Sequence, residues 1–447
     1  MSNYLDTEDN IVALATSGGP GALDVIRISG ENLRAIYRKI TKKKSLPSPN
    51  TIKKHNIYSP LNGELLDSSM VSFFASPKSF TGQDVLEINC HGGGYISNKI
   101  IQLLSLEKNT RIALPGEFLF RAYINNKVDL IQAESINEMI SSESSKHNNK
   151  SLENLAGKLS EKVLLIKKLI LNLLLTIEHE LDFDESEISH ISDAEIIKKT
   201  KEIIKSMESV TECYFFSKTV RFGLRLLLLG KPNVGKSSIY NQLLGINRSI
   251  VSDVPGTTRD TIESSLEING YKVLLVDSAG FWESADAVEK MGIEKTSNEI
   301  ALADIIILVG ETNKDISAFK GLLKDKNVIV VRSKSDIHKY NKKQLSVSTE
   351  NGSGFSDLST EISTKIKEYY SNNKMNNEFF INERQYQVLI ESKKRVGDLL
   401  KDVQAGINRD ILADLLHIIL DEYNNIINPV DREDIINKIF AGFCIGK

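Results

Sequence analysis

A complete phosphate-binding loop stands in the middle of this 447-residue chain, with the sequence Gly-Lys-Pro-Asn-Val-Gly-Lys-Ser at residues 230–237. Its two glycines let the backbone curl so that successive N–H groups point at an anion. Lys236 is placed to reach the β- and γ-phosphates, and the Ser237 hydroxyl is placed to bind Mg²⁺. The apolar run Arg225–Leu229 predicts a buried parallel strand before the loop, and Ser238–Leu244 predicts a helix after it. The chain must therefore contain an α/β nucleotide-binding domain.

Three motifs after this loop indicate which nucleotide is bound. A strand predicted at Tyr271–Val276 runs into Asp-Ser-Ala-Gly at 277–280, which provides a carboxylate on the Mg²⁺ side and a backbone N–H near the γ-phosphate. A strand predicted at Val328–Val331 leads to Ser-Lys-Ser-Asp at 333–336, which is similar to the guanine-reading Asn-Lys-x-Asp of GTPases. Residues 348–354 have the spacing of the loop that closes over the base. Each motif alone is also compatible with an ordinary turn, but their order favours GTP over ATP.

The segment 252–260 is predicted to be the nucleotide-dependent switch. Thr258 is its natural switch residue, with its hydroxyl on Mg²⁺ and its N–H on the γ-phosphate. Phe281 stands where Ras-type enzymes carry a Gln that orients water, so the catalytic machinery must differ. Lys236 and Thr258 are predicted to act in catalysis, and Ser237 and Thr258 to bind Mg²⁺. The predicted GTP-binding set comprises Asn233, Val234, Gly235, Lys236, Ser237, Ser238, Ser252, Asp253, Val254, Pro255, Gly256, Thr257, Thr258, Asp277, Ser278, Ala279, Gly280, Ser333, Lys334, Ser335, Asp336, Ser348, Thr349 and Glu350.

Composition bears on three further properties: nucleic-acid binding, cellular compartment and membrane contact. The net charge of −3 does not indicate nucleic-acid binding by the chain as a whole, so an RNA contact must rely on local patches. The basic run Arg38–Lys44 is one such candidate, with a solvated loop as the alternative. The chain has three cysteines, Cys90, Cys213 and Cys444, and no two of them form a Cys-x-x-Cys motif. This pattern indicates a reducing cytoplasm. The most apolar helical segment, Val163–Ile177, falls short of the ~20 residues that a membrane span needs, so no membrane contact is expected.

Proline placement and periodicity divide the chain. Six of the nine prolines precede residue 116, and the Gly/Pro turns between short apolar runs predict an α+β domain over 1–125. Segments 126–221 and 374–447 show helical periodicity, and the P-loop domain (222–373) lies between them. The predicted fold class is therefore multidomain α/β plus α, with a Ras-like P-loop domain inserted into a helical domain. Residues expected to share one helix face are Leu152, Leu155, Leu159, Val163 and Ile166.

Several segments outside the GTPase motifs form a recognisable pattern along the chain. They are Asp9–Gly30, Thr81–Glu87, Cys90–Gly93, Pro115–Phe118, Arg121-Ala122, Lys127–Leu130 and Phe443–Lys447. Together with the GTPase motifs, they resemble from end to end the tRNA uridine-modification GTPase MnmE (TrmE) family. No other GTPase pattern combines this N-terminal region, this nucleotide domain and this tail.

The resemblance implies a function. With an FAD-containing partner protein, MnmG (also called GidA), the family adds a carboxymethylaminomethyl-type (aminomethyl) group to carbon 5 of the wobble uridine of certain tRNAs. GTP hydrolysis is implied to drive the conformational cycle. A reduced folate such as 5,10-methylene-tetrahydrofolate is implied to supply the methylene carbon and to bind the N-terminal domain, which also carries the contact of a homodimer. The family's folate positions fall on Arg27, Glu87, Lys127 and Lys447.

The resemblance also implies how GTP is hydrolysed. A potassium ion near the β- and γ-phosphates is implied to neutralise the charge that an arginine finger neutralises elsewhere. Glu289 matches the carboxylate that organises the attacking water, although the residue alone is a solvated one in a charged segment. Without the family resemblance, Arg27 and Lys127 would be interpreted as ordinary surface charges. The implied K⁺ ligands are Asn233, Ser252, Val254 and Thr257.

Two other classes of function are compatible with the GTPase motifs. One is a switch GTPase that binds ribosomal RNA or an assembly particle without covalent chemistry, and the other is a nucleotide-gated scaffold that does not bind folate. The switch GTPase explains the P-loop domain but not Arg27, Glu87, Lys127 and Lys447.

Overall fold

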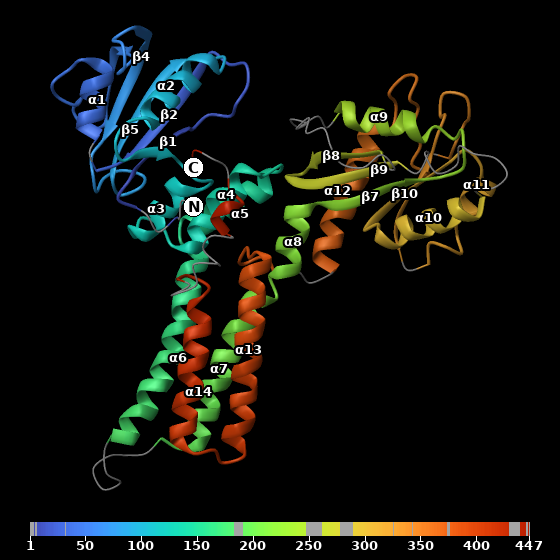
Figure 1. Cartoon of the computed structure of the whole chain (residues 1–447). Coiled ribbons are helices and arrows are strands. Elements are labelled where there is room, and N and C mark those ends of the chain that lie inside the picture. The colour runs from blue at the N-terminus through green and yellow to red at the C-terminus, as the bar shows by residue number, and fades with distance from the viewer. Residues whose placement is uncertain are drawn as a thin grey trace. The chain divides into compact units, whose positions relative to one another are not determined.

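The computed structural model describes residues 4, 7–31, 33–182, 191–246, 262–277, 289–324, 326–341, 343–372, 376–428, 439–443 and 446 (Figure 1). The chain divides into two compact units. Unit 1 comprises Met1–Asn137 and Leu420–Lys447, and unit 2 comprises Glu138–Ile419. The predicted boundary after residue 125 lies inside unit 1, and those after 221 and 373 lie inside unit 2. The division into four domains therefore stays a prediction.

Unit 1 is built on a six-stranded sheet with the order β3-β4-β5-β2-β1-β6, in which only β1 and β6 pair in parallel. Helices α1 and α2 pack on one face, because the apolar sides of both helices join the alternate strand residues that point the same way. The other face receives Phe118 of α3, which packs on Ile11 and Ala13. The elements are β1 Asn10–Leu14, β2 Leu23–Gly30, α1 Leu33–Thr41, β3 Thr51–Tyr58, β4 Leu65–Phe74, β5 Asp84–His91, α2 Tyr95–Ser105, β6 Thr110–Ile112, α3 Glu117–Ile124 and α4 Leu130–Ile140.

The second sheet lies in unit 2 and has the order β11-β10-β7-β9-β8. Strands β7, β9, β10 and β11 are parallel, and β8 runs antiparallel to β9 at the edge. The elements are β7 Leu224–Leu229, α9 Lys236–Ile246, β8 Ile262–Ile268, β9 Tyr271–Asp277, α10 Glu289–Leu302, β10 Ile305–Gly310, α11 Asn313–Ser317, β11 Asn327–Arg332 and α12 Phe355–Asn372.

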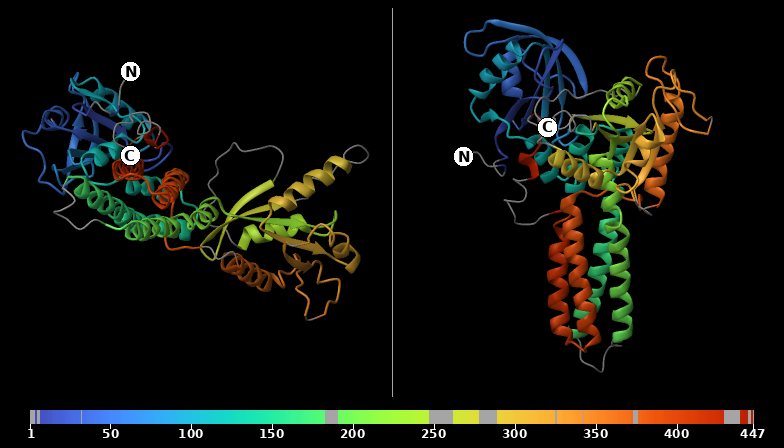
Figure 2. Two further views of the ribbon diagram at one scale, coloured as in Figure 1. Left: turned by 90° about the horizontal axis from the view of Figure 1, so that it is seen from below. Right: turned by 90° about the vertical axis from the view of Figure 1, so that its right-hand side faces the viewer.

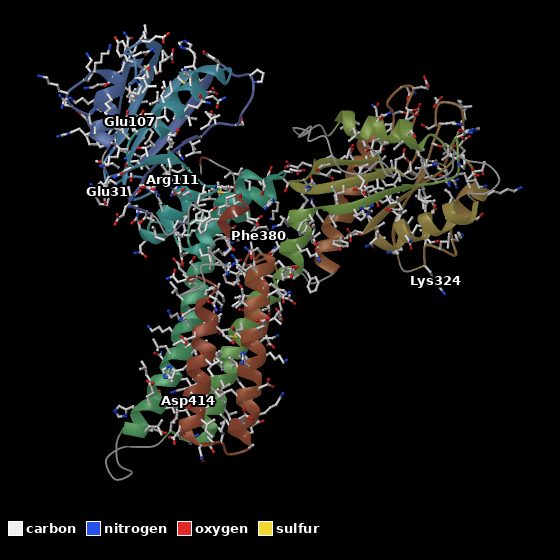
Figure 3. All side chains as sticks on the ribbon, viewed as in Figure 1. Glu31, Glu107, Arg111, Lys324, Phe380 and Asp414 are labelled. Atoms are coloured by element: carbon white, nitrogen blue, oxygen red, sulfur yellow. The ribbon has the colours of Figure 1, made fainter. Side chains whose placement is uncertain are left out.

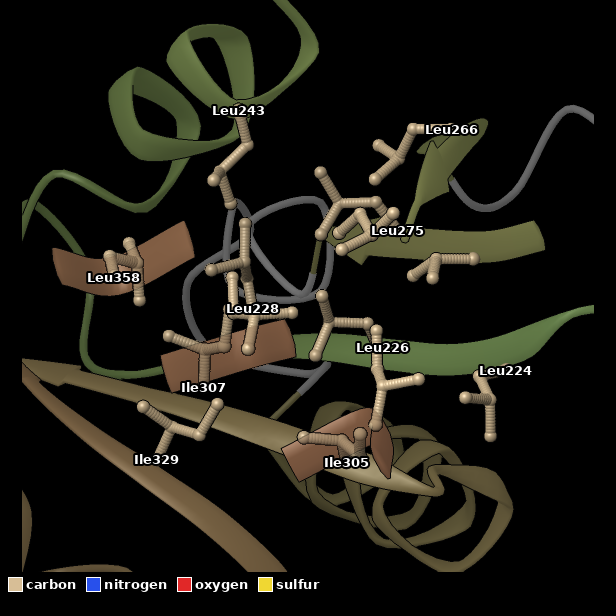
Figure 4. Close-up of a cluster of buried hydrophobic side chains, with 14 of the residues drawn as sticks. Leu224, Leu226, Leu228, Leu243, Leu266, Leu275, Ile305, Ile307, Ile329 and Leu358 are labelled. Atoms are coloured by element: carbon tan, nitrogen blue, oxygen red, sulfur yellow. The ribbon is translucent and has the colours of Figure 1, made fainter. Parts of the chain in front are cut away.

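Helices cover both faces of this second sheet, which explains why its central strands are continuously apolar. Leu226 and Leu228 of β7 face a core shared with α9 and α12, part of which Figure 4 shows. Leu227 and Leu229 face the opposite core, which contains residues of α10 and the segment after α11. A parallel strand buried on both sides requires an uninterrupted apolar run, and β7 provides one with leucine instead of the more usual β-branched residues.

The remaining helices of unit 2 flank this sheet in the sequence. They are α5 Ser145–Leu155, α6 Lys158–Asp182, α7 Asp193–Thr211, α8 Tyr214–Phe222, α13 Glu383–Gln404 and α14 Arg409–Asn424. Helices α6, α7, α13 and α14 run side by side in the views of Figures 1 and 2. Among the described helices, none combines the length and the apolar character that crossing a membrane requires.

The single helix face predicted through residues 152–166 is wrong for Leu152. Helix α5 ends at Leu155, Gly157 has a φ of 97°, and α6 begins at Lys158. Leu152 is consequently exposed, whereas Leu159 and Val163 are buried. Gly157, with its left-handed backbone conformation, separates α5 from α6. The apolar face of α6 therefore does not continue the face of α5 that carries Leu152.

Candidate nucleotide-binding site

The phosphate-binding loop connects the buried strand β7 to α9, as predicted. Gly230 passes close to β10, because a Cβ atom there would lie 2.4 Å from the Val309 carbonyl oxygen. Asn233 and Gly235 both have positive φ, at 63° and 89°. Left-handed residues within a turn at the start of a helix form a concave group of backbone N–H donors, which is a site for anions.

Lys236 is held at the base of this loop. It is buried, and its Nζ donates to the carbonyl oxygens of Gly230 at 2.9 Å and Lys231 at 2.8 Å. Burial lowers the pKa of Lys236, and the charge of Asp277 partly offsets this effect. A phosphate bound in the loop would stabilise the charged ammonium group further, because it adds a second anion next to a desolvated cation.

The predicted Mg²⁺ side of the site pairs a hydroxyl with a carboxylate. Ser237 Oγ donates to Asp277 Oδ2 at 3.0 Å, and Asp277 is buried at the end of β9. Hydroxyl and carboxylate oxygens are ligands that Mg²⁺ prefers, so these two residues fit the ion directly or through its water shell.

The two predicted base-side segments lie together. Ser335 N donates to the Val347 carbonyl oxygen at 3.1 Å, which joins the segment after β11 to the later loop. Asp336 is exposed, and a hydrogen bond from the Ser348 hydroxyl lowers its pKa by stabilising the carboxylate form. Ser348 Oγ also accepts from Glu350 N at 3.3 Å. The carboxylate that is predicted to read guanine is thus positioned by the loop that is predicted to close over the base.

One cavity of about 550 Å³ unites the phosphate loop with both base-side segments. Its volume is in the range of ordinary small-molecule sites. The predicted binding set left out four of the residues that line this cavity. Pro232 belongs to the predicted phosphate loop, whereas Ile239, Ile337 and Val347 carry no chemical signal apart from their position beside the motifs. The predicted residues that line it are Asn233, Gly235, Lys236, Ser237, Ser238, Ser333, Lys334, Asp336, Thr349 and Glu350.

Several predicted site residues cannot be placed. Glu289 begins α10, but its side chain is outside the described part of the structure. The positions that lie outside the described residues are Ser252, Asp253, Val254, Pro255, Gly256, Thr257, Thr258, Ser278, Ala279, Gly280, Phe281, Cys444 and Lys447.

Ser333 leaves an unused hydrogen-bonding group beside the cavity. The residue is 3% exposed, and its hydroxyl has no hydrogen-bond partner among the described residues. Its carbonyl oxygen accepts from Tyr340 Oη at 2.7 Å, which fixes the backbone. A serine therefore occupies the position of the usual asparagine without replacing that residue's amide contacts.

Replacing Ser333 with Asn should tighten GDP and GTP binding by up to roughly tenfold, because one or more neutral hydrogen bonds of about 0.5–1.5 kcal/mol each are restored. Ser333→Ala is the matched control and should change affinity little, since the hydroxyl it removes is unpaired. Titration calorimetry measures both. An unchanged affinity in Ser333→Asn would mean that this segment does not contact the nucleotide as predicted.

Two of the predicted folate residues form a pair in unit 1. Arg27 and Glu87 are opposite each other on β2 and β5, and their side chains form an ion pair with a distance of 2.8 Å between Nη2 and Oε1. The Arg27 guanidinium lies over the rings of Phe80 and Phe118, at 5.7 and 5.8 Å from their centroids. Its Nη1 donates to the Gly446 carbonyl oxygen at 3.4 Å. This cluster combines charge with aromatic surface, and Gly446 lies beside it.

Lys127, the third predicted folate residue that the structure describes, donates from its Nζ to the Pro77 carbonyl oxygen at 2.9 Å. His91, the other chemically suggestive side chain here, has its Nδ1 2.6 Å from Asp67 Oδ1, and this carboxylate oxygen accepts the hydrogen bond. The described residues hold no cluster of three or more metal-binding side chains. His91 therefore has an ordinary side-chain partner.

The fold and the cavity together define the class of protein to which this chain belongs. A mostly parallel sheet with a phosphate loop after its central strand, and a cavity that this loop shares with the segment of the predicted guanine motif, make this a P-loop GTPase domain flanked by helices. Family models are more specific: one for the MnmE helical domain matches residues 130–444, and one for the GTP-binding protein TrmE N-terminus matches residues 10–127.

Full-length relatives agree with these matches. The tRNA modification GTPase MnmE of Moorella thermoacetica is 33% identical over 464 residues, covering 98% of this chain and all of the relative. Those of Clostridioides difficile and Aquifex aeolicus are 34% and 33% identical, each covering 98% of this chain and 99% of the relative. The chain belongs to the tRNA modification GTPase MnmE family. This confirms the predicted family, the predicted fold class and a GTP hydrolase that acts in tRNA modification.

Proposed function

We propose that this chain is a K⁺-stimulated, Mg²⁺-dependent GTPase that installs a carboxymethylaminomethyl-type group at carbon 5 of the wobble uridine of certain tRNAs in the cytoplasm. It acts as a homodimer together with the FAD-containing partner MnmG, and a reduced folate such as 5,10-methylene-tetrahydrofolate supplies the methylene carbon. The observation that carries the proposal is the presence of two separate sites on one chain, the GTP cavity in unit 2 and the Arg27–Glu87 cluster in unit 1.

The Arg27–Glu87 cluster fits a reduced folate chemically. Arg27 can pair with a folate carboxylate, and Glu87 can accept from N–H groups of the pteridine ring. Phe80 is 40% exposed beside the guanidinium and offers an apolar surface for a flat ring. Because Arg27 and Glu87 already neutralise each other, folate must exchange part of this pair for its own contacts. Lys127 and the terminal Lys447 complete the proposed folate set.

Arg27→Ala should weaken the binding of a reduced folate by about 1.5–3 kcal/mol, the cost of one charge-assisted contact, and leave GTP affinity intact. Arg34→Ala is the matched control, because Arg34 is an exposed arginine of the same unit on α1. Calorimetry with a stable reduced folate measures the difference. Equal folate affinity in the wild type and both variants would remove Arg27 from the site.

In the GTP site, Ser237 and Thr258 are proposed to hold Mg²⁺, and Asn233, Ser252, Val254 and Thr257 to hold K⁺. The Asn233 side chain is exposed and lines the cavity, so its amide oxygen can reach such an ion. Bound cations at the β- and γ-phosphates supply charge neutralisation that the hydrophobic Phe281 cannot provide. Lys236 positions the phosphates, and Glu289 is proposed to orient the attacking water.

Exchange of Na⁺ for K⁺ should raise GTP turnover strongly at protein concentrations where two GTPase domains can pair. Asn233→Gly is the sharpest control, since glycine tolerates the φ of 63° while the proposed ligand is removed. This variant should turn over GTP at the same low rate in both salts. A wild type with equal rates in Na⁺ and K⁺ would exclude a potassium site.

The proposed function as a whole is tested by nucleoside mass spectrometry of tRNA from cells that lack the chain. The modified wobble uridine should disappear and return on complementation with the wild-type chain. Persistence of the modified nucleoside would favour a switch GTPase without covalent chemistry.

A further inference from the structure

A strongly basic surface occurs in unit 1, far in the sequence from the GTPase motifs. Residues 33–54 contain eight basic residues and no acidic residue, although the chain as a whole has 56 basic and 59 acidic residues. Such a local concentration on a slightly acidic chain is a feature of nucleic-acid contacts. We call this surface the basic patch, and its members are Arg34, Arg38, Lys39, Lys42, Lys43, Lys44, Lys53 and Lys54.

The fold keeps the basic residues on the outside. Helix α1 buries Leu33, Ile36, Tyr37 and Ile40 against the sheet, so the charged side chains between them face solvent. The three consecutive lysines follow the end of α1, and the remaining two lie on β3, the edge strand of the sheet. All eight residues are exposed.

Contacts between α1 and β3 bring the two groups of charges together. Tyr37 Oη and His55 Nε2 are 3.0 Å apart, which ties the helix to the strand. Burial lowers the pKa of His55, and the nearby charges of Lys43 and Lys53 lower it further. Lys42 Nζ lies 3.7 Å from the ring centroid of Tyr58. Cations from the helix end and from the strand thus share one region that also contains aromatic rings.

Carboxylates do not neutralise this surface. Among the described residues, only Lys39 of the patch forms an ion pair, with Glu107, which Figure 3 labels. Glu31 and Glu64 flank the segment in the sequence, and neither forms an ion pair with it. Lys42 donates to the Gly63 carbonyl oxygen at 3.3 Å, a neutral partner. The like charges therefore repel one another, and a polyanion would relieve this repulsion.

We infer that the basic patch binds the phosphate backbone of tRNA. The identity of the polyanion rests on the proposed function, whereas the site rests on the charges and contacts above. Lysine and arginine that neutralise phosphates release condensed counterions, which makes affinity strongly dependent on salt. Contacts of this kind position an RNA without reading its sequence, so one patch can serve several tRNAs.

The test compares charge-reversal variants of the full-length chain by fluorescence anisotropy with labelled tRNA over a range of salt concentrations. The triple variant Lys42→Glu, Lys43→Glu, Lys44→Glu should bind tRNA about tenfold or more weakly at about 50 mM salt. The slope of log affinity against log salt should fall by about two to three, corresponding to three lost phosphate contacts. GTP turnover without tRNA should be unchanged.

The matched control is Lys198→Glu, Lys201→Glu, Lys205→Glu, which reverses the same number of charges on exposed lysines of α7 in unit 2. It should retain wild-type affinity and slope. A second variant, Lys53→Gln with Lys54→Gln, changes the strand side of the patch and covers the case in which the triple variant does not fold. Circular dichroism and thermal unfolding verify the fold of each.

Five outcomes decide the inference. Selective loss of tRNA affinity in the patch variants supports it. Unchanged binding in folded patch variants, equal loss in the α7 control, or a wild-type chain that does not bind tRNA would each overturn it. Patch-dependent binding to vesicles of anionic phospholipid with unaffected tRNA binding would overturn it as well and assign the surface to lipid headgroups. The nucleoside analysis is independent, so the patch can fail while the proposed function stands.

Discussion

Replacing Asp336 with Asn should abolish the preference for guanine nucleotides and create a preference for xanthine nucleotides. The carboxylate of Asp336 is predicted to accept from the N1–H and 2-amino groups of guanine, a pair of donors that adenine lacks. An Asn amide repels the 2-amino group but donates to the 2-oxo group of xanthine. Loss of a two-fold contact to an ionised group should weaken GTP binding by roughly tenfold or more. Competition between GTP and XTP in titration calorimetry measures the reversal.

The structure supports the predicted effect of Asp336→Asn and also provides a control variant. Asp336 lines the nucleotide cavity, and the Ser348 hydrogen bond, which lowers its pKa, orients the carboxylate. Asp357→Asn removes an exposed carboxylate of the same unit that does not line this cavity, and it should leave nucleotide preference unchanged. If Asp336→Asn still selects GTP over XTP, the guanine motif has been placed wrongly at 333–336.

Glu289→Ala should separate GTP binding from GTP hydrolysis. Orienting the attacking water contributes only in the transition state, so GTP affinity should stay near that of the wild type while turnover falls by about 100-fold or more. Single-turnover hydrolysis and nucleotide titration on the same preparation show whether the two quantities separate.

Two variants sharpen the test of Glu289. Glu289→Gln retains the shape but not the basicity of the side chain, and it shows whether charge or position matters. Asn298→Ala changes an exposed residue of the same helix and should be neutral. Turnover within a few-fold of the wild type in Glu289→Ala would assign the water to another residue.

The parts of the fold that could be predicted are those with a strong local signal. The phosphate loop fixed the positions of β7 and α9, and the apolar runs at Val328–Val331 and Tyr271–Val276 mark β11 and β9 with errors of about one residue at each end. The inner strand β10, a neighbour of β7, was missed, even though Ile305–Gly310 is buried throughout. No chemical motif accompanies this strand, and a short apolar run alone does not distinguish strand from helix.

What could not be predicted depends on contacts between distant residues. The Arg27–Glu87 pair joins residues 60 positions apart in the sequence, and only the family resemblance marked them. The unpaired hydroxyl of Ser333 and the hydrogen bond between Ser348 and Asp336 exist only once β11 and the later loop are folded together. Similarly, the strand β3 reads as a polar segment, because edge strands need little apolar surface.

The most direct test of the proposed function follows the methylene carbon from the reduced folate to the tRNA. The purified chain, its FAD-containing partner, unmodified tRNA, GTP, K⁺ and Mg²⁺ are combined with a reduced folate labelled in its one-carbon group and with a nitrogen source, either ammonium or glycine. Mass spectrometry of the digested tRNA should find the label in the methylene carbon attached to carbon 5 of the wobble uridine. Lys236→Ala and Arg27→Ala should each lower the incorporation of label. A modified nucleoside without label would contradict the proposed role of folate, and no modification in the complete mixture would contradict the account itself.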